Sequence, residues 1–185
     1  MFPLAYVLGD ILTEVYGFKA SRRVIWTGFC ALLLTMLTLL LLKVLPAEAF
    51  WEQNTGSAAY DSVLGGMFTG GIILASISAY LTGEYLNAVL LSKIKILMKG
   101  RHLWLRALVS SIAGEFADSF IFILIATLTK VFPKELFWSL VLTNYLLKML
   151  IEIIVLPVTC RVSRFLKQKE GIDTFDINEK YSPLP

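Results

Sequence analysis

Long apolar runs alternate with short basic segments along the chain. Val24 to Leu42 is a run of 19 residues without a charge, and Ser62 to Gly83 is a run of 22. A helix needs about 20 apolar residues to cross a hydrocarbon core about 30 Å thick, so both runs are long enough to span a membrane. The pattern predicts five apolar helical segments, namely Met1–Tyr16, Val24–Leu45, Ser62–Leu91, Ala107–Thr129 and Leu136–Cys160.

The composition agrees with a membrane protein. Of the 185 residues, 57% are hydrophobic, and the mean hydropathy is +0.72, which soluble domains rarely reach. No hydrophilic stretch is long enough for a separate soluble domain. We therefore expect an all-α, polytopic transmembrane helix bundle over residues 1–160. A polar tail follows over residues 161–185, and we expect its end to be mobile and dispensable.

Lysine and arginine gather on one side of the predicted bundle. The first, third and fifth connecting regions contain 13 of the 17 basic residues, whereas the opposite side contains only Lys43, Lys130 and Lys134. Because basic loops resist translocation, we expect the basic side and the C-terminus to be cytoplasmic. The first segment then runs toward the cytoplasm with no polar flank before it. Its 16 residues span only about 24 Å, so we expect complete relatives to have one more helix, with five of six present here.

Acidic side chains interrupt these apolar segments, although an ionised carboxylate at the centre of a bilayer costs roughly 3 kcal/mol even on a lenient scale. Most of them lie nine to twelve positions from the basic residue that marks the cytoplasmic boundary. At about 1.5 Å per residue, they are close to the midplane, where transporters usually bind their substrate. We therefore expect one layer of ionisable groups around a polar cavity. The six residues are Asp10, Glu14, Glu84, Glu115, Asp118 and Glu152.

Polar residues also recur at helical spacing, which places them on shared helix faces that should turn away from lipid. Two alternatives stay open: Lys148 and Glu152 can neutralise each other as an i, i+4 pair, and Glu14 can reach the interface near Lys19. Glycines at 65, 66, 70, 71, 83 and 114 favour close helix packing. The polar faces are Asp10 with Glu14, Glu84 with Asn87, Ser111 with Glu115 and Asp118, and Asn144 with Lys148 and Glu152.

Three blocks of the sequence resemble the queuosine precursor transporter family of bacterial inner membranes. They are FPLAYVLGDILTEVYGFKASRR, AYLTGEYLNAVLLSKIKILMKGRHLWLRALVSSIAGEFADSFIF and NYLLKMLIEIIVLP, in that order. The resemblance covers nearly all of Phe2 to Thr159. It implies a six-helix fold similar to the substrate-binding subunits of vitamin uptake systems, and import of a 7-deazaguanine base (preQ0, preQ1 or queuine) for tRNA modification.

The family pattern also implies a set of substrate-binding residues. Two departures matter: the family's first helix is absent, and Ser119 stands where threonine is expected. Arg22, Arg23 and Gly114 also match the pattern. The predicted substrate-binding residues are Asp10, Glu84, Asn87, Glu115, Asp118, Asn144 and Lys148.

The chemistry of a 7-deazaguanine suggests roles for these residues. Glu115 or Asp118 could accept two hydrogen bonds from the adjacent N–H and amino groups, bonds that are strengthened by the carboxylate's charge. An asparagine, Asn87 or Asn144, could read the carbonyl edge. Either Asp10 or Glu84 could balance the aminomethyl cation of preQ1, and Lys148 could donate to the carbonyl oxygen.

Other functions are weaker fits to the same residues. An importer of another vitamin-like molecule would use the same layer. An intramembrane enzyme would use Glu115 and Asp118 as an acid/base pair, but no nucleophile or metal set accompanies them. A scaffold protein would not need buried charges. Cys30 and Cys160 read as small packing residues and His102 as a solvated loop residue.

We accordingly expect a transporter and not an enzyme, with no cofactor, no metal and no nucleic-acid partner. Its partners are a small-molecule substrate and the lipid bilayer, and an oligomer is compatible with the pattern. Several properties stay open at the level of sequence. They are the precursor carried, the energy coupling (proton symport or facilitated diffusion), the oligomeric state and whether Met1 is the true start.

Overall fold

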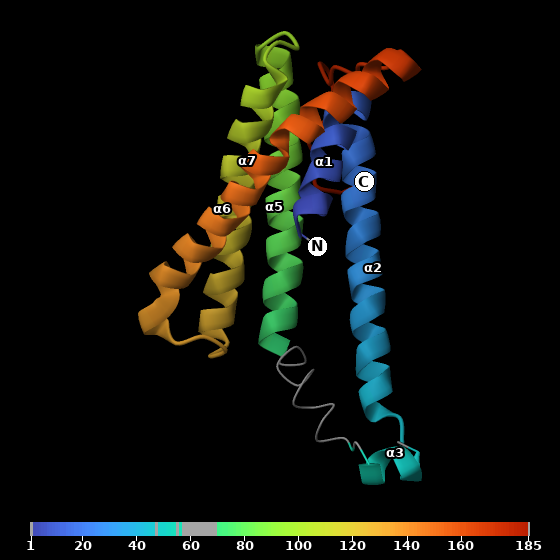
Figure 1. The fold of residues 1–185 in the computed structure, drawn as a ribbon, viewed down its shortest axis with the longest axis vertical. Helices are drawn as coiled ribbons and strands as arrows, with labels where there is room; N and C mark the ends of the chain where they lie inside the picture. Colours follow the sequence, from blue (N-terminus) through green and yellow to red (C-terminus); the bar gives the residue numbers. More distant parts are fainter. Residues whose placement is uncertain (1, 47, 55, 57–69, 185) are drawn as a thin grey trace.

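The computed structural model describes residues 2–46, 48–54, 56 and 70–184, and every regular element in this part of the chain is a helix. The predicted all-α class is confirmed (Figure 1). The elements are α1 (Phe2–Tyr16), α2 (Phe18–Val44), α3 (Ala49–Asn54), α5 (Gly70–Leu97), α6 (Leu103–Leu128), the short 3-10 helix η1 (Lys134–Leu136) and α7 (Phe137–Glu170).

Four helical stretches are long and apolar enough to cross a membrane: Phe18–Leu42, Gly71–Leu97, Leu103–Leu128 and Lys134–Glu170. These correspond to four of the five predicted segments, which confirms a polytopic bundle. The fifth, α1, has 15 residues and at 1.5 Å per residue is about 22 Å long. The part of the predicted Ser62–Leu91 segment before Gly70 lies outside the described residues, as do Gly65 and Gly66.

The helices continue beyond the predicted apolar segments. Helix α2 begins at Phe18 and not at Val24, α6 begins at Leu103, and α7 ends at Glu170 and not at Cys160. Hydropathy marks only the part of a helix that lies in hydrocarbon, whereas lysine and arginine are good helix formers and let a helix continue into water. Residues 161–170 of the predicted tail are therefore helical.

Large apolar side chains on α2 and α7 point away from the protein. Leu34, Leu37 and Leu41 on α2 are exposed, and so are Leu146 and Ile154 on α7. A soluble monomer rarely exposes so continuous an apolar surface. These faces fit contact with lipid, while polar groups fill the inside of the bundle.

Two glycines bring α5 and α6 into close contact. A Cβ atom at Gly83 would lie 2.6 Å from Cβ of Asp118, and one at Gly114 would lie 2.7 Å from Cβ of Asn87. Small residues at such crossings let helix backbones approach closely. The interpretation of these two glycines as packing residues is confirmed, and the crossing places Asn87 beside α6 and Asp118 beside α5.

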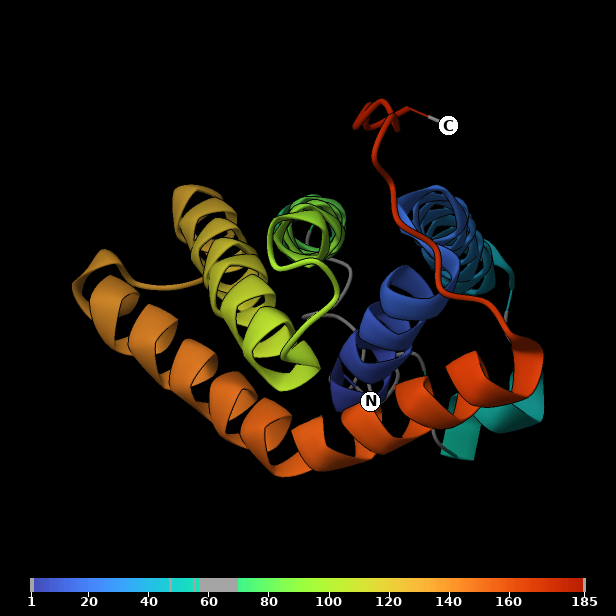
Figure 2. The ribbon, with the colours of Figure 1, turned by 90° about the horizontal axis from the view of Figure 1, so that it is seen from above.

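Helix α7 joins two parts of the bundle. Its Leu156 and Cys160 pack against Leu103 and Ala107 of α6. Farther along α7, Leu166 packs on α1, and Pro157 lies inside the helix next to Leu156. Figure 2 shows the last turns of α7 crossing beside α1, whereas its first turns run along α6. Because proline removes a backbone hydrogen bond, it allows a helix to bend at this point.

The end of the chain, which the sequence predicts to be mobile, is docked against the bundle. Asp176 accepts hydrogen bonds from the backbone N–H of Phe18 (2.9 Å) and from Oγ of Ser92 (2.6 Å). Trp26 donates from Nε1 to the carbonyl of Pro183 (2.7 Å). The docked segment runs from the end of α7 past α1 to α2 (Figure 2).

Gly17 makes room for this docking. It separates α1 from α2 with φ of +85°, a left-handed conformation that favours glycine. A Cβ atom at this position would lie 2.7 Å from Oδ1 of Asp176. We call this side of the molecule, formed by the start of α2, the turn between α5 and α6 and the docked tail, the basic end. It contains Lys19, Arg22, Lys99, Arg101 and Lys167.

Candidate functional site

Four helices bring polar side chains together inside the bundle. The acidic residues Asp10, Glu115 and Glu152 are 1% exposed, and Glu84 and Asp118 are 7% and 6% exposed. We call this set, together with Asn87, Ser111 and Lys148, the acidic layer. The acids lie close enough for electrostatic interaction between α1, α5, α6 and α7.

Asp10 and Asn87 form the contact between α1 and α5. Nδ2 of Asn87 donates to Oδ1 of Asp10 at 2.7 Å. Within the described part of the chain, Oδ2 of Asp10 and Oδ1 of Asn87 have no hydrogen-bond partner, although both are buried. Buried polar atoms are nearly always paired in folded proteins, so these two acceptors are available to a ligand that brings donors.

Helices α6 and α7 are joined by an ion pair and a hydrogen bond. Lys148 donates to Oδ2 of Asp118, and Oγ of Ser111 donates to Oε1 of Glu152 at 3.4 Å. The pair between Lys148 and Asp118 thus crosses between helices. Lys148 is the basic residue that α7 contributes to the acidic layer, and it lies on the same face of the helix as Glu152.

Glu84 and Glu115 complete the acidic layer from α5 and α6. The carboxylate of Glu84 lies against α1, where a Cβ atom at Gly9 would be 3.1 Å from its Oε2. In the described structure, Oε2 of Glu115 and Oγ of Ser119 lack a hydrogen-bond partner. The layer is therefore rich in acceptors, which suits a ligand with several N–H groups.

Most of the predicted site residues meet in this layer, and Asn144 is the exception. Asn144 is half-buried, one turn along α7 from Lys148, and among the described residues no hydrogen bond joins it to the layer. Tyr6 is a buried residue that the prediction missed; it is 4% exposed and interacts electrostatically with Asp118 and Glu84. Its spacing of four residues before Asp10 could have revealed it.

Glu14 is buried among basic side chains inside the bundle. It is 1% exposed and accepts hydrogen bonds from Arg106 and Lys167. Lys95 and Arg106 belong to the basic segment between the third and fourth predicted apolar segments, but both side chains are almost fully buried. Nothing in their sequence surroundings distinguishes them from the exposed Lys93 and Arg101.

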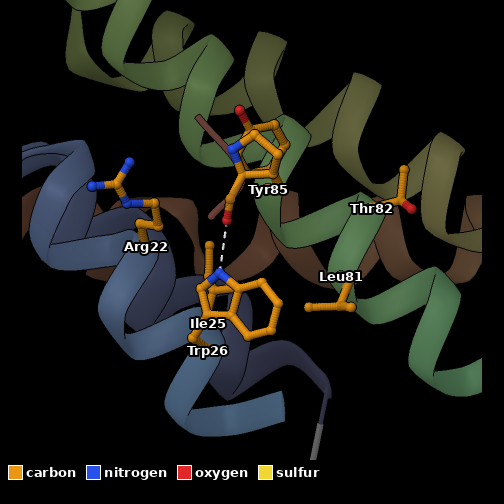
Figure 3. A pocket seen from close by; sticks show the side chains of 7 residues that line it. Arg22, Ile25, Trp26, Leu81, Thr82 and Tyr85 are labelled. Carbon is orange, nitrogen blue, oxygen red and sulfur yellow. Dashed lines mark hydrogen bonds between the residues drawn. The ribbon is translucent and has the colours of Figure 1, made fainter. Parts of the chain in front are cut away.

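A separate cavity of about 220 Å³ lies between α2, α5 and the docked tail (Figure 3). Arg22 is the charged residue of its lining, which is otherwise formed by residues such as Ile25, Leu81 and Tyr85. Nη1 of Arg22 already donates to the carbonyl of Ser182 at 3.1 Å. This cavity has few groups that could recognise a polar substrate, so the acidic layer is the better candidate site.

The described residues include no group of three or more histidine, cysteine, aspartate or glutamate side chains that could hold a metal ion. The two cysteines are unpaired. Cys160 is buried, as a packing residue should be, whereas Cys30 is exposed on α2. His102 is exposed at the start of α6, as expected of a loop residue.

Comparison with known proteins agrees with this architecture. Residues 1–162 match the model of a family described as "Putative vitamin uptake transporter". The chain belongs to this family. The buried polar layer between membrane helices is thus found in a member of a transporter family, and no solved structure gives a significant match to the chain.

Curated proteins with related sequences carry more specific names. The chain is 28% identical over 171 residues to the "Probable queuosine precursor transporter" of Bacillus subtilis, and 25% identical over 158 residues to the "Queuosine precursor transporter" of Escherichia coli. A Haemophilus influenzae relative is 24% identical over 155 residues. The alignments cover 92%, 83% and 83% of this chain, but 72%, 65% and 61% of those relatives.

Proposed function

We propose that this vitamin uptake transporter family member carries queuosine precursors, which are 7-deazaguanine bases, across the bacterial inner membrane. We further propose that its basic end faces the cytoplasm, because basic segments resist translocation. The names of three related proteins support the substrate class. Since the chain spans about two thirds of the length of two of them, the activity of the whole protein is part of the proposal.

One observation carries the proposal: buried acceptor atoms in the acidic layer have no partner among the described residues. They are Oδ2 of Asp10, Oδ1 of Asn87 and Oε2 of Glu115. A 7-deazaguanine presents an N–H and an amino group side by side, which suit carboxylate acceptors. Binding would satisfy groups that are costly to leave unpaired in a buried site.

Further residues of the acidic layer have roles in the same proposal. Glu84 lies against Gly9, the neighbour of Asp10 in α1, and interacts electrostatically with Asp10. The two carboxylates would balance a cationic aminomethyl group. Lys148, paired with Asp118 across α6 and α7, would donate to the substrate carbonyl or balance the carboxylates when the site is empty. Asn144 lies one turn before Lys148 in α7, farther from the basic end, so it would contact a substrate only from that side of the acidic layer.

A second candidate is another vitamin-like molecule, which the description of the family favours. It would use the same layer, because the acceptors and Lys148 do not by themselves define a purine-like ring. A competition experiment separates the two: 7-deazaguanine bases should displace any other bound ligand only if they are the better substrates.

An uptake assay tests the proposal directly. The chain is expressed in cells that cannot make queuosine, preQ0, preQ1 or queuine is supplied, and tRNA is assayed for the modification. We expect Asp118→Ala to abolish the modification when it is compared at matched amounts of protein in the membrane, and Glu135→Gln, on the exposed η1 helix, to leave it unchanged. Undiminished modification in Asp118→Ala would remove this residue from the site.

A further inference from the structure

One carboxylate oxygen collects three cations between the acidic layer and the basic end. Oε1 of Glu14 accepts a hydrogen bond from Nη2 of Arg106 at 3.0 Å and another from Nζ of Lys167. Nζ of Lys95 lies 3.7 Å from the same oxygen. The side chains of Glu14 and Arg106 are 1% exposed, and that of Lys95 is 2% exposed.

The docked tail completes this arrangement. Oδ1 of Asp173 lies 2.6 Å from Nζ of Lys95 and 2.8 Å from Nζ of Lys167. Lys95 also donates to the backbone carbonyls of Glu14 (2.6 Å) and Thr174 (2.7 Å). We call the five ionisable residues Glu14, Lys95, Arg106, Lys167 and Asp173 the Glu14 cluster.

The Glu14 cluster lies next to the acidic layer on the same helices. Glu14 follows Asp10 by one helical turn on the same face of α1, which is about 6 Å toward the basic end. Lys95 lies eight residues beyond Asn87 in α5, and Arg106 lies five residues before Ser111 in α6. Each of the four helices that contribute to the layer also contributes one residue to the cluster.

Stability alone is a poor reason for such a cluster. Burying charges requires removal of water, and well-packed apolar residues are often as stable as a buried ion pair or more so. The cluster is also not fully satisfied, because Nε and Nη1 of Arg106 and Oε2 of Glu14 have no hydrogen-bond partner among the described residues. Paired charges can also separate, because water can hydrate each group once they are apart. Such a separation opens a hydrated passage, whereas apolar contacts at the same place would exclude water.

We propose that the Glu14 cluster is the gate between the acidic layer and the basic end, and that the docked tail holds this gate closed through Asp173. The inference builds on the proposed transport function, because a substrate that leaves the layer toward the basic end must pass these side chains. Opening separates Lys167 and the tail from Glu14 while α1, α5 and α6 stay packed.

The elements that carry the cluster allow such a movement. Lys167 lies beyond Pro157 in the last turns of α7, which cross beside α1 (Figure 2). Asp173 follows Gly171, which ends α7. The two groups that must leave Glu14 are therefore held on the last turns of α7 and on the segment after it.

The chain contains a natural reporter of this movement. Cys160 is 8% exposed, packs against Leu103 and Ala107, and lies seven residues before Lys167 on the same face of α7. Separation of Lys167 from Glu14 would part α6 and α7 here and expose the thiol. Cys30 is exposed on α2 and would also be labelled. The substitution Cys30→Ser removes it and leaves Cys160 as the single thiol of the chain.

The test measures the rate at which a maleimide labels Cys160 in the full-length Cys30→Ser protein, reconstituted in lipid nanodiscs. Glu14→Gln should raise this rate about tenfold or more, because it leaves buried cations without their partner. Asp173→Asn, whose side chain is 45% exposed, should raise it about threefold, as expected for a more solvated pair. Glu135→Gln on η1 should leave the rate unchanged.

Equal labelling rates in Asp173→Asn, Lys167→Gln and the parent protein would overturn the proposal. These two variants change partly exposed side chains, so they keep the test decisive if Glu14→Gln does not fold. Thiol labelling requires no substrate. Faster labelling of the variants without any uptake of 7-deazaguanine bases would therefore contradict the proposed function but still support the proposed gate.

Discussion

Individual carboxylates in this bundle differ in the cations and hydrogen-bond donors that surround them. Which of these groups a carboxylate meets depends on the helix that faces it. Glu14 is surrounded by Arg106, Lys167 and Lys95, whereas Oδ2 of Asp10, one turn away, has no hydrogen-bond partner in the described structure. In the first arrangement three cations of the protein offset the charge of Glu14, although its Oε2 also lacks a hydrogen-bond partner among the described residues. The second leaves acceptor capacity for a ligand.

The pair between Asp118 and Lys148 provides the first prediction, which concerns stability. Asp118→Asn or Lys148→Gln alone should destabilise the protein by about 3 kcal/mol, because each leaves an uncompensated charge in a low-dielectric interior. The double variant should lose much less than the sum of the two. Thermal unfolding of the four proteins in detergent measures this coupling, and additive losses would show that the two charges do not interact.

The docked tail carries a prediction of pH dependence through Asp173. Burial alone would raise the pKa of this carboxyl, but hydrogen bonds from Lys167 and Lys95 outweigh it and hold the pKa below its ordinary value of 3.8. A lowered pKa in the folded state means that its contribution to docking is complete above that ordinary value. The contribution is lost as the pH falls through the lowered pKa.

Hydrogen exchange of residues 171–184 measures this effect. Protection in the tail should be constant from about pH 7 to about pH 5 and should fall only below the ordinary carboxyl range. In Asp173→Asn the protection should already be reduced at neutral pH and should depend less on acid. Loss of protection between neutral pH and pH 5 in the parent protein would contradict this account.

Helix packing supplies the prediction at the scale of elements. A Cβ atom at Gly83 or Gly114 would meet atoms of the facing helix at under 3.0 Å, so alanine at either position should force α5 and α6 apart. We expect a loss of about 1–3 kcal/mol, typical of overpacked sites. Thr82→Ala, an exposed change on the same helix, is the control in thermal unfolding. Equal stability of Gly114→Ala would show that the crossing is looser than described.

The elements themselves could largely be predicted from the sequence, because hydropathy and helical spacing are local properties. The common depth of Asp10, Glu84 and Glu115 follows from a constant rise per residue, and the layer forms as expected. The pairing of Lys148 with Asp118 could not be predicted from the sequence. Glu152, on the same helix as Lys148, and Asp118, on α6, are both carboxylates and are equally suitable by chemistry. Only the crossing of α6 and α7 decides between them.

The tail shows a different limit of prediction. Its polar composition, with Gly171, Asp173 and Asp176, is typical of a segment that remains in solvent without packing on the protein. Its order comes from partners that lie about 80 to 160 positions earlier in the chain, such as Ser92 and the backbone of Phe18. The same holds for Lys95, whose burial depends on where the tail returns.

At the scale of the whole molecule, two layers of charge lie one above the other inside an apolar shell. The acidic layer has acceptors for a ligand, and the Glu14 cluster with the docked tail closes its basic end. Removal of residues 171–185 should therefore lower the thermal unfolding midpoint by several degrees and speed thiol labelling of Cys160. A truncated protein with unchanged stability and labelling would show that the tail is dispensable after all.

Equilibrium binding of preQ1 to the purified, reconstituted protein, measured by titration calorimetry, tests the central claim most directly. The account predicts saturable binding that falls by about a hundredfold in Asp118→Asn or Glu115→Gln, since each removes a charge-assisted acceptor worth about 1.5–3 kcal/mol. It predicts no change in Glu135→Gln. Binding that is equally strong in all three variants would place the substrate outside the acidic layer and contradict the account.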